Sequence, residues 1–482
     1  MLKRLLFIIL FCLQYSIIAE AQIRQLDQSV SKFLAQFKEK PALGISVINT
    51  KTGKLVYDYN GEKLLAPAST LKLLTSYATL KILGPEYQFP TEVFVDKLPL
   101  ADDFTSGKKD VGKVGNLSVR GYGDPAVVHE TVFDWALTLK QLGVRQIDTL
   151  QLDDTLFVNT SVPSGDNPYQ AAQGALSLNH NSYGLRIVPA GQQRKAVIET
   201  FPEIPISLDN NLISINSPEL PLQVKQQVSN ADLFAKRADL SALKLSVIGQ
   251  VKANAKSYIE YRSVFSPTQY FGSVFKSYLE KVGVSVGQVR IAAVGGRAKL
   301  LTEFKSKPLA QIISDLNHYS NNFIAGQLLY ALGQKNNALF DRETGIGKLE
   351  MVMSELDISS DSYRIYDGSG LNAENKITAQ ALSAVLQAAY ADFTVAPYFV
   401  SSLSRYGASG TLKKRSLGPG YEKDEAAIWA KTGTIDGVSS LAGYVTTRKG
   451  ERIAFSVISN GISIKQLAID FEDELLRVLI AQ

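Results

Sequence analysis

A serine and a lysine one helical turn apart, Ser69 and Lys72, are the residues in this chain best suited to chemistry. They begin a helix-like segment over residues 70–83, where a spacing of three places two side chains on the same face. A lysine amine within hydrogen-bond distance of a hydroxyl can accept its proton. The pair therefore predicts a serine nucleophile that is activated without a histidine. The same spacing at Ser29 and Lys32 shows that the pair alone is weak evidence, because a capping serine beside a solvated lysine also produces it.

Two further motifs follow in order along the chain. Ser320-Asn321-Asn322 lies far downstream, and Lys431-Thr432-Gly433 comes after it. The order S-x-x-K, S-D-N and K-T-G is the pattern of penicillin-binding proteins and class A β-lactamases. Asn321 stands here in place of the central Asp. Considered alone, Ser320 would be interpreted as an ordinary polar residue of a helix. The three motifs occurring together in this order favour a functional site.

The residue types suggest a role for each side chain. Ser69 would be the nucleophile, and Lys72 would have to be neutral part of the time to act as its base. Burial of the amine, together with a positive charge from Lys431 if it lies close, would lower the pKa of Lys72. Ser320 would pass a proton between Lys431 and the leaving amine, and Asn322 would hold a substrate carbonyl or the Lys72 amine.

The segment Lys431-Thr432-Gly433-Thr434 places further functional groups on one predicted strand. Lys431 supplies charge, Thr432 a hydroxyl for a substrate carboxylate, and Gly433 room for the substrate backbone. Backbone N–H groups of Ser69 and Thr434 are expected to form the oxyanion hole, because an acyl-transfer oxyanion needs converging donors. The alternative interpretation of Thr432 and Gly433 is an ordinary strand end.

Metal-based and histidine-based mechanisms fit the sequence less well. The chain has 3 histidines, and the start of an H-E-x-x-H motif at His129 and Glu130 has Phe133 where the second histidine should stand. We therefore expect no metal and no cofactor. A G-x-S-x-G sequence at 283–287 has only His318 after it as a histidine, so we interpret it as a helix end followed by a strand.

Length, composition and charge indicate a globular protein of several domains that does not bind nucleic acid. The chain has 482 residues, more than one core usually supports, so two or three domains are expected. Its 45% hydrophobic and 20% charged residues are ordinary for a globular protein. The net charge of +5 is small for this length, and no basic run is interleaved with aromatic residues, so nucleic acid is not an expected partner.

The N-terminus is typical of an export signal. Lys3 and Arg4 precede a largely apolar stretch, 5–18, and Ala19-Glu20-Ala21 is a cleavage-site pattern. We expect residues 1–21 to be a signal peptide, so that the protein is exported and meets the membrane only transiently. A retained anchor is the alternative, although the apolar stretch is short for a membrane span. The only cysteine lies inside this segment, which suits an oxidising compartment.

Hydrophobic periodicity divides the chain after the signal into parts. Residues 43–60 resemble a hairpin whose turn carries a second K-T-G, Lys51-Thr52-Gly53, which we interpret as a structural coincidence. One helix is expected over 308–332, carrying Ser320, and Asp367 is expected to form a glycine-rich turn rather than act as an acid. The predicted organisation is a first part of one α/β domain (22–86), a β-rich insertion (87–299) and a second part of the α/β domain (300–482).

With these motifs the chain resembles the serine D-Ala-D-Ala carboxypeptidases of the penicillin-binding protein 4 type. The resemblance covers nearly the whole chain after the signal peptide. The long interval between Ser69 and Ser320 matches enzymes of this type, which carry inserted domains there. Further segments that carry the resemblance are Gly121–Pro125, Ala175–Asn179, Asp367–Leu371 and Ser409–Leu412.

The resemblance implies a transpeptidase/β-lactamase-like α/β fold, a sheet flanked by helices, with a large β-rich insertion between the first and second motifs. It implies a periplasmic D-alanyl-D-alanine carboxypeptidase that acts on peptidoglycan stem peptides, often also as an endopeptidase, and that binds β-lactam inhibitors. It assigns catalysis to Ser69, Lys72, Ser320, Asn322 and Lys431, and substrate binding to Thr432, Gly433 and Thr434.

Two other functions remain as alternatives. A serine β-lactamase shares the motif pattern, but the sequence has no E-x-x-L-N segment to supply a deacylating glutamate. A non-catalytic peptidoglycan-binding scaffold is the second alternative, and the complete motif set argues against it. Labelled penicillin separates the three functions, because a β-lactamase releases it, a scaffold does not react with it and a carboxypeptidase retains it.

Overall fold

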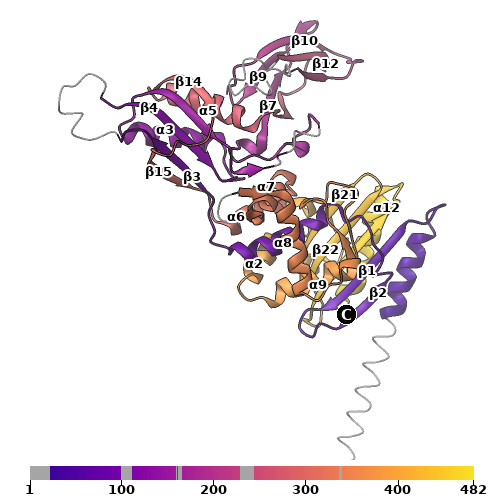
Figure 1. Cartoon of the computed structure of the whole chain (residues 1–482). Helices are drawn as coiled ribbons and strands as arrows, with labels where there is room; N and C mark the ends of the chain where they lie inside the picture. The colour runs from indigo at the N-terminus through magenta and orange to yellow at the C-terminus, as the bar shows by residue number, and fades with distance from the viewer. Residues whose placement is uncertain are drawn as a thin grey trace, which may run out of the picture. The chain divides into compact units, whose positions relative to one another are not determined.

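The computed structural model describes residues 22–98, 111–158, 160, 165–227, 244–335 and 339–481 (Figure 1). The predicted signal peptide therefore lies outside the described residues. Among the described residues, no helix is both long enough and apolar enough to cross a membrane. The chain groups into two compact units. The first consists of the part up to Tyr87, Leu309–Ala325 and the part from Ile346, and the second of Gln88–Pro308 and Gly326–Gly345.

An antiparallel sheet of six strands forms the centre of the first unit, in the order β2-β1-β23-β22-β21-β20. The first two strands are the predicted hairpin. The second K-T-G sequence, Lys51-Thr52-Gly53, occupies its turn, where Gly53 has a φ of 68°. The strands are β1 (Ala42–Asn49), β2 (Leu55–Tyr59), β20 (Ser404–Arg405), β21 (Ile428–Ile435), β22 (Val438–Thr446) and β23 (Arg452–Asn460).

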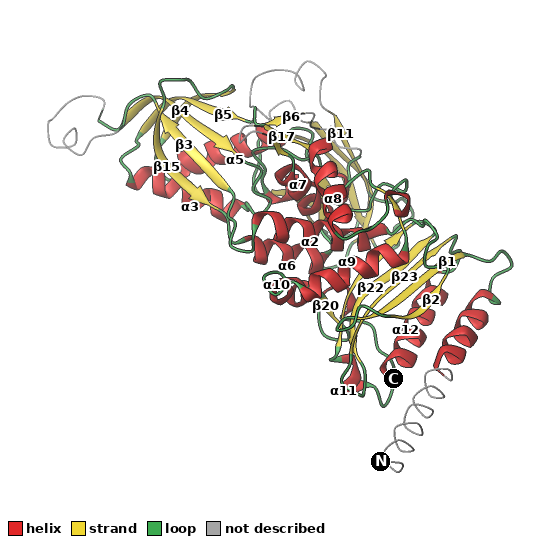
Figure 2. Cartoon of the chain, turned by 60° about the horizontal axis from the view of Figure 1, so that its bottom comes forward, coloured by secondary structure: helices red, strands yellow, loops and turns green. Residues whose placement is uncertain are grey.

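Helices cover both faces of this sheet, as Figure 2 shows. Nearly every position of β22 and β23 is buried, as in strands that are covered on both sides. α12 (Lys465–Ile480) packs on β22, and α9 (Ala379–Ala391) packs on β1 and β23. The helix of residues 22–34 joins the α12 side of the core, where Phe33 stacks on Phe471 with ring centroids 4.3 Å apart.

A buried helix carries the first motif. The chain enters a 3-10 turn, η1 (Ala68–Leu71), and continues directly as α2 (Lys72–Leu83). Residues 72–80 are all buried, so protein surrounds this helix, which has no polar face. It ends at Gly84, whose φ of 83° suits glycine. The other helices outside the inserted segment are α6 (Leu309–Tyr319), α7 (Asn322–Leu332), α8 (Arg342–Glu355), η6 (Ser360–Ser362), α10 (Ala396–Ser402), η7 (Gly410–Leu412) and α11 (Glu422–Glu425).

The prediction of one helix over 308–332 is wrong, because the structure has two helices there. α6 ends at Tyr319 and α7 begins at Asn322. Ser320, between them, has a φ of 55°, which is outside the right-handed helical region. The side chain of Asn321 explains the restart, since its Oδ1 accepts the backbone N–H three residues later at 3.1 Å. This is the geometry of a helix N-cap.

A mixed sheet of five strands and two helices forms the main core of the second unit, with the strand order β14-β5-β4-β3-β15. α3 (His129–Gln141) connects the parallel strands β4 and β5 and packs against α5 (Pro267–Lys281). Gly283, with a φ of 86°, follows α5 directly before β14, so the interpretation of 283–287 as a helix end followed by a strand is confirmed. The strands are β3 (Pro90–Val95), β4 (Lys113–Gly121), β5 (Gln146–Asp153), β14 (Ser285–Ile291) and β15 (Lys299–Lys305).

Smaller sheets complete the two units. In the second unit the orders are β13-β7-β9, β11-β12-β10-β8 and β16-β17-β6. In the first unit β18 (Tyr363–Arg364) pairs with β19 (Lys376–Ile377). The remaining elements are β6 (Phe157–Val158), η3 (Pro168–Gln170), η4 (Asn179–Asn181), β7 (Ser182–Val188), β8 (Arg194–Lys195), β9 (Val197–Phe201), β10 (Ser207–Ile215), β11 (Gln223–Gln227), β12 (Lys244–Lys252), β13 (Tyr258–Ser263), β16 (Gln334–Lys335) and β17 (Leu339–Asp341).

Candidate active site

The Lys72 amine is the centre of a hydrogen-bonded group within the first unit. Its side chain is fully buried. Nζ donates to the hydroxyl of Ser69, to Oδ1 of Asn322 and to the backbone oxygen of Ser369, each at 2.7 Å. The fold therefore brings the first and second motifs together, and it adds a backbone acceptor that the motifs do not contain.

Burial lowers the pKa of Lys72 from 10.5 to about 7, and the negative charge of Asp367 opposes this shift. Near neutral pH the amine is consequently neutral about half of the time. A neutral amine keeps two N–H groups for Asn322 and Ser369 and directs its lone pair at Ser69. The Ser69 hydroxyl can then donate to Nζ, so the group can take up the serine proton without a rearrangement.

A tight loop presents the backbone acceptor to Lys72. Asp367 accepts the backbone N–H groups of Ser369, Gly370 and Asn372 at 2.7, 2.6 and 2.8 Å, so the prediction that Asp367 forms a turn is confirmed. Gly370 has a φ of 77°, and a Cβ at this position would lie 1.8 Å from the carbonyl oxygen of Ala68. Only glycine therefore allows the loop to pack against the residue before Ser69.

Two residues of the group have backbone conformations that residues with a Cβ rarely adopt. Ala68, directly before Ser69, has a φ of 49°, and Ser320 has a φ of 55°. Each of these conformations helps to place one of the two serine hydroxyls. Such strain persists only where the surrounding packing holds it, and it is concentrated at functional sites.

Lys431 and Ser320 form a second lysine–serine pair. Nζ of Lys431 donates to the Ser320 hydroxyl and to the backbone oxygen of Thr432, both at 2.7 Å. Burial lowers the pKa of Lys431 well below its usual value, and the charge of Lys72 lowers it further. The sequence predicted burial and the charge of Lys431 as the two causes of a lowered pKa for Lys72. Burial is the main cause for both amines, and it is Asp367, not Lys431, whose charge acts on the pKa of Lys72. Two coupled, buried amines beside two serines are suited to moving protons.

The strand β21 lies close against the turn that carries Ser69. A Cβ on Gly433 would lie 2.2 Å from Ser440 Oγ, 2.6 Å from the oxygen of Pro67 and 3.0 Å from the nitrogen of Ser69. Gly433 is therefore required by packing inside the protein. This reason differs from the approach of a substrate backbone, which the sequence suggested for the glycine.

The outer edge of β21 is open beyond Ala430. β20 pairs only with Trp429 and Ala430, and the sheet order shows no further strand on that side in the part of the chain that the structure describes. Along this open edge Thr432 is half-buried and Thr434 is exposed. Unpaired strand edges present N–H and C=O groups that can pair with an extended peptide.

His318 and His129 contact groups other than the two lysine–serine pairs. Nε2 of His318 is 3.3 Å from Ser409 Oγ, and Nδ1 is 3.1 Å from the oxygen of Ser314. His129 Nδ1 lies 3.1 Å from a carboxylate oxygen of Glu130. Within the described residues, no three or more His, Cys, Asp or Glu side chains form a group that could hold a metal ion.

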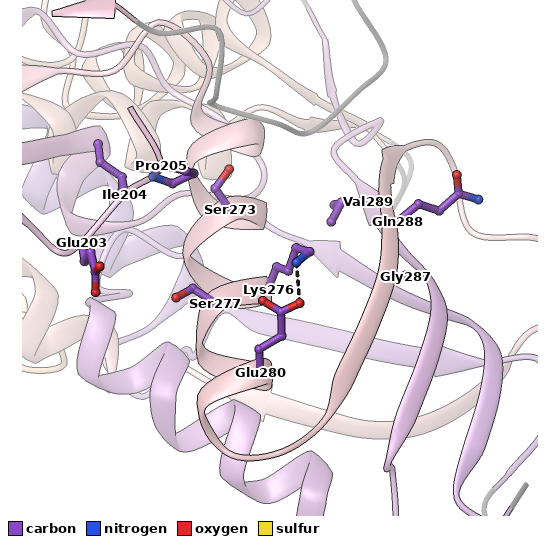
Figure 3. Close-up of a pocket in the computed structure, with 10 residues that line it drawn as sticks. All are labelled: Glu203, Ile204, Pro205, Ser273, Lys276, Ser277, Glu280, Gly287, Gln288 and Val289. Carbon is purple, nitrogen blue, oxygen red and sulfur yellow. Dashed lines mark hydrogen bonds and ion pairs between the residues drawn. The ribbon is translucent and has the colours of Figure 1, made fainter. Parts of the chain in front are cut away.

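A hollow of about 660 Å³ is formed by residues of the second unit, between α5, β14 and the segment 203–205 (Figure 3). Lys276 and Glu280 on α5 are joined by an ion pair at this hollow. Its lining residues belong to the second unit, whereas all predicted site residues belong to the first. The chemistry of its side chains, and not the size of a hollow, therefore distinguishes the candidate site.

The helix-flanked sheet, with a Ser-x-x-Lys helix packed against a Lys-Thr-Gly strand, is that of penicillin-binding transpeptidase-like and β-lactamase-like proteins, so the predicted fold class is confirmed. The chain belongs to the D-Ala-D-Ala carboxypeptidase 3 (S13) family, which matches residues 26–478. The predicted resemblance to enzymes of the penicillin-binding protein 4 type is confirmed by this match and by the relatives.

Curated relatives and solved structures cover most of the chain. A D-alanyl-D-alanine carboxypeptidase of Actinomadura sp. is 29% identical over 470 residues, which are 92% of this chain and 82% of the relative. The carboxypeptidase DacB of Haemophilus influenzae is 25% identical over 470 residues, 91% of this chain and 89% of the relative.

The crystal structure of penicillin-binding protein 4 from H. influenzae has a TM-score of 0.78 at 23% identity, covering 94% of this chain and 99% of that one. A predatory peptidoglycan endopeptidase from Bdellovibrio bacteriovorus shares the fold with a TM-score of 0.54 at 17% identity, over 92% of this chain and 93% of that one.

Proposed function

We propose that this chain is a serine D-alanyl-D-alanine carboxypeptidase that forms its acyl-enzyme on Ser69. The observation that carries the proposal is the 2.7 Å contact between the Ser69 hydroxyl and the buried Lys72 amine, whose pKa is about 7. The family supplies the substrate class, peptides that end in D-Ala-D-Ala. Endopeptidase cleavage of peptidoglycan cross-bridges is proposed as a second activity of the same serine, and the fold shared with a peptidoglycan endopeptidase is consistent with it.

In the acylation step, Ser69 Oγ attacks the carbonyl carbon of the penultimate D-Ala while Lys72 Nζ accepts the hydroxyl proton. The backbone N–H groups of Ser69 and Thr434 bind the oxyanion. The C–N bond then breaks, and the departing D-Ala amine receives a proton that Ser320 relays from the lysine pair. Asn322 holds the Lys72 amine in place during the transfer.

In the deacylation step, a water molecule gives a proton to Lys72 and attacks the ester carbonyl. The C–O bond to Ser69 breaks, and the serine regains a proton. One water is consumed, one D-Ala and one shortened peptide are released, and the enzyme returns to its starting state.

We propose that the peptide binds as an additional strand at the open edge of β21. Main-chain pairing along this edge would run the peptide past Ser69, because Gly433 allows the strand to lie against the nucleophile turn. The terminal carboxylate would lie near the Thr432 hydroxyl and Lys431, since bonds to a charged acceptor are the strongest hydrogen bonds available there.

β-Lactam inhibitors are proposed to acylate the same serine. The H. influenzae penicillin-binding protein 4 has been solved in complex with a β-lactam. A β-lactamase would release the opened drug, whereas we propose that this site retains it. A non-catalytic scaffold is disfavoured because the buried amines of Lys72 and Lys431 each contact a serine hydroxyl.

We further propose the domain organisation and the location. Residues 22–86 and 300–482 would form the transpeptidase-like domain, residues 87–299 its insertion, and residues 1–21 a signal for transport to the periplasm. The compact grouping of Gln88–Pro308 supports the insertion, and Gly326–Gly345 groups with it. The mass of the secreted protein tests the signal, since cleavage would leave Gln22 at its N-terminus.

Release of D-Ala tests the function. The chain from Gln22 onward is incubated with a peptide that ends in D-Ala-D-Ala, beside the Ser69→Ala variant. Wild-type protein is expected to release D-Ala, and the variant is expected to lose at least about 1,000-fold in rate, as for other nucleophile removals. Ser29→Ala is the matched control, because Ser29 has the same spacing to Lys32 but lies outside the candidate site. Undiminished release by Ser69→Ala, or none by the wild type, would contradict the proposal.

A further inference from the structure

A polar turn lies beside the strand that carries the Lys-Thr-Gly motif. η7 holds Thr411, whose hydroxyl accepts a hydrogen bond from the Thr432 hydroxyl with 2.8 Å between the two oxygens. Thr411 is exposed and Thr432 is half-buried, so the pair of hydroxyls is accessible from solvent. No function was predicted for Thr411 from the sequence.

The backbone fixes the position of Thr411. Gly410 has a φ of 57°, and a Cβ there would lie 2.1 Å from Ser404 Oγ and 3.0 Å from the oxygen of His318, so only glycine fits. The backbone N–H of Thr411 donates to the hydroxyl of the buried Ser404 at 3.2 Å. Thr411 is therefore held beside β21 by the fold and not only by its contact with Thr432.

The other end of this segment is anchored in the core. Arg415 donates to Glu472 at 2.8 Å and also to Asp473, two largely buried carboxylates on α12. Glu472 also accepts the Ser439 hydroxyl at 2.8 Å, and Ser439 is the register partner of Thr434 on β21. The segment after the turn and β22, the strand paired with β21, thus contact the same carboxylate of α12.

Two hydroxyls at this spacing suit a carboxylate. Each hydroxyl can donate one O–H, and each carboxylate oxygen can accept one. In the free protein Thr432 donates to the neutral oxygen of Thr411. A carboxylate is a stronger acceptor than a hydroxyl, so a bound carboxylate would attract both protons.

We propose that Thr411 and Thr432 bind the terminal carboxylate of the substrate together, one oxygen each. Thr411 then selects peptides with a free C-terminus and is a specificity-determining residue. This inference rests on the proposed function of the Ser69 site, and it adds a contact from a different part of the chain to the Lys-Thr-Gly strand.

Steady-state kinetics with two substrates test the inference. One peptide ends in D-Ala-D-Ala with a free carboxylate, and the other is its C-terminal amide. Thr411→Val removes the hydroxyl and keeps the shape of the side chain. It is expected to raise KM for the acid about tenfold, to leave kcat within about twofold, and to lower the preference for the acid over the amide about tenfold. Thr411→Ser restores the hydroxyl and should restore the preference.

The second K-T-G sequence supplies a matched control. Thr52→Val makes the same chemical change at an exposed threonine in the β1–β2 turn, and it should leave both substrates unaffected. The adduct of penicillin with Ser69 is measured in parallel by intact mass. If Thr411→Val still forms this adduct but keeps the wild-type preference for the acid, or loses activity equally on both peptides, the inference fails while the proposed function stands. If the wild-type protein forms no adduct and releases no D-Ala, the function fails and the inference fails with it.

Discussion

The pH dependence of acylation follows directly from the buried Lys72 amine. Only the neutral amine can accept the Ser69 proton, so the rate should fall as the pH falls through the pKa of Lys72, which is about 7. About 1% of the amine is neutral at pH 5, about half at pH 7 and about nine-tenths at pH 8. The acylation rate should therefore fall about 100-fold between pH 8 and pH 5, with a slope of about tenfold per pH unit below pH 6.

The assay measures the rate at which a labelled penicillin becomes attached to the protein. Samples are quenched at successive times, at pH values from 5 to 9. Penicillin keeps its carboxylate ionised throughout this range, so the titration belongs to the protein. Lys72→Arg provides the comparison, because a guanidinium stays protonated over the whole range. We expect this variant to react about 100- to 10,000-fold more slowly than wild type at pH 8, with no rise near pH 7.

Two results would contradict the proposed role of Lys72. A wild-type rate that stays constant from pH 5 to pH 8 would mean that Lys72 is not the base. A rise with a midpoint near pH 10 would mean that burial does not lower the pKa of Lys72 as the structure indicates. Circular dichroism over the same pH range controls for acid unfolding.

Three further perturbations test individual contacts. Asp367→Asn removes the negative charge that raises the pKa of Lys72, so the midpoint of the acylation profile should move to lower pH, and a shift to higher pH would contradict this sign. Gly433→Ala would bring a Cβ to 2.6 Å from the oxygen of Pro67, and denaturant unfolding should show a loss of about 1–3 kcal/mol together with slower acylation; an unchanged variant would argue against the close packing of β21. Arg415→Ala leaves two largely buried carboxylates without their partner and should cost about 3–5 kcal/mol of unfolding free energy, whereas a loss below about 1 kcal/mol would show that water replaces the guanidinium.

The motif side chains could be predicted because their residue types and order restrict the chemistry. Ser69 and Lys72 lie within one turn of local structure, and Lys431 lies on a strand that its apolar neighbours predict. Contacts among these residues join parts of the chain that are hundreds of residues apart, yet the motif order alone was sufficient to place them in one site. The helix end at Gly283 and the hairpin around 43–60 were equally accessible, because glycine marks such boundaries.

Contacts made by the backbone could not be predicted in this way. The oxygen of Ser369 contacts Lys72, but any residue type can supply a backbone oxygen, so no sequence pattern marks it. The break between α6 and α7 was missed because the apolar periodicity continues through it, and only the capping side chain of Asn321 reveals the restart. Thr411 was missed because its partner, Thr432, meets it only in the folded protein.

The intact mass of the protein after incubation with penicillin, for the wild type and for Ser69→Ala, tests whether Ser69 is the nucleophile. We predict that the wild type gains the mass of one penicillin, that this gain persists for hours, and that the modified peptide contains Ser69. We predict no gain in the variant. Lack of an adduct in the folded wild type, or an adduct of the same yield in Ser69→Ala, would contradict the claim that Ser69 is the nucleophile.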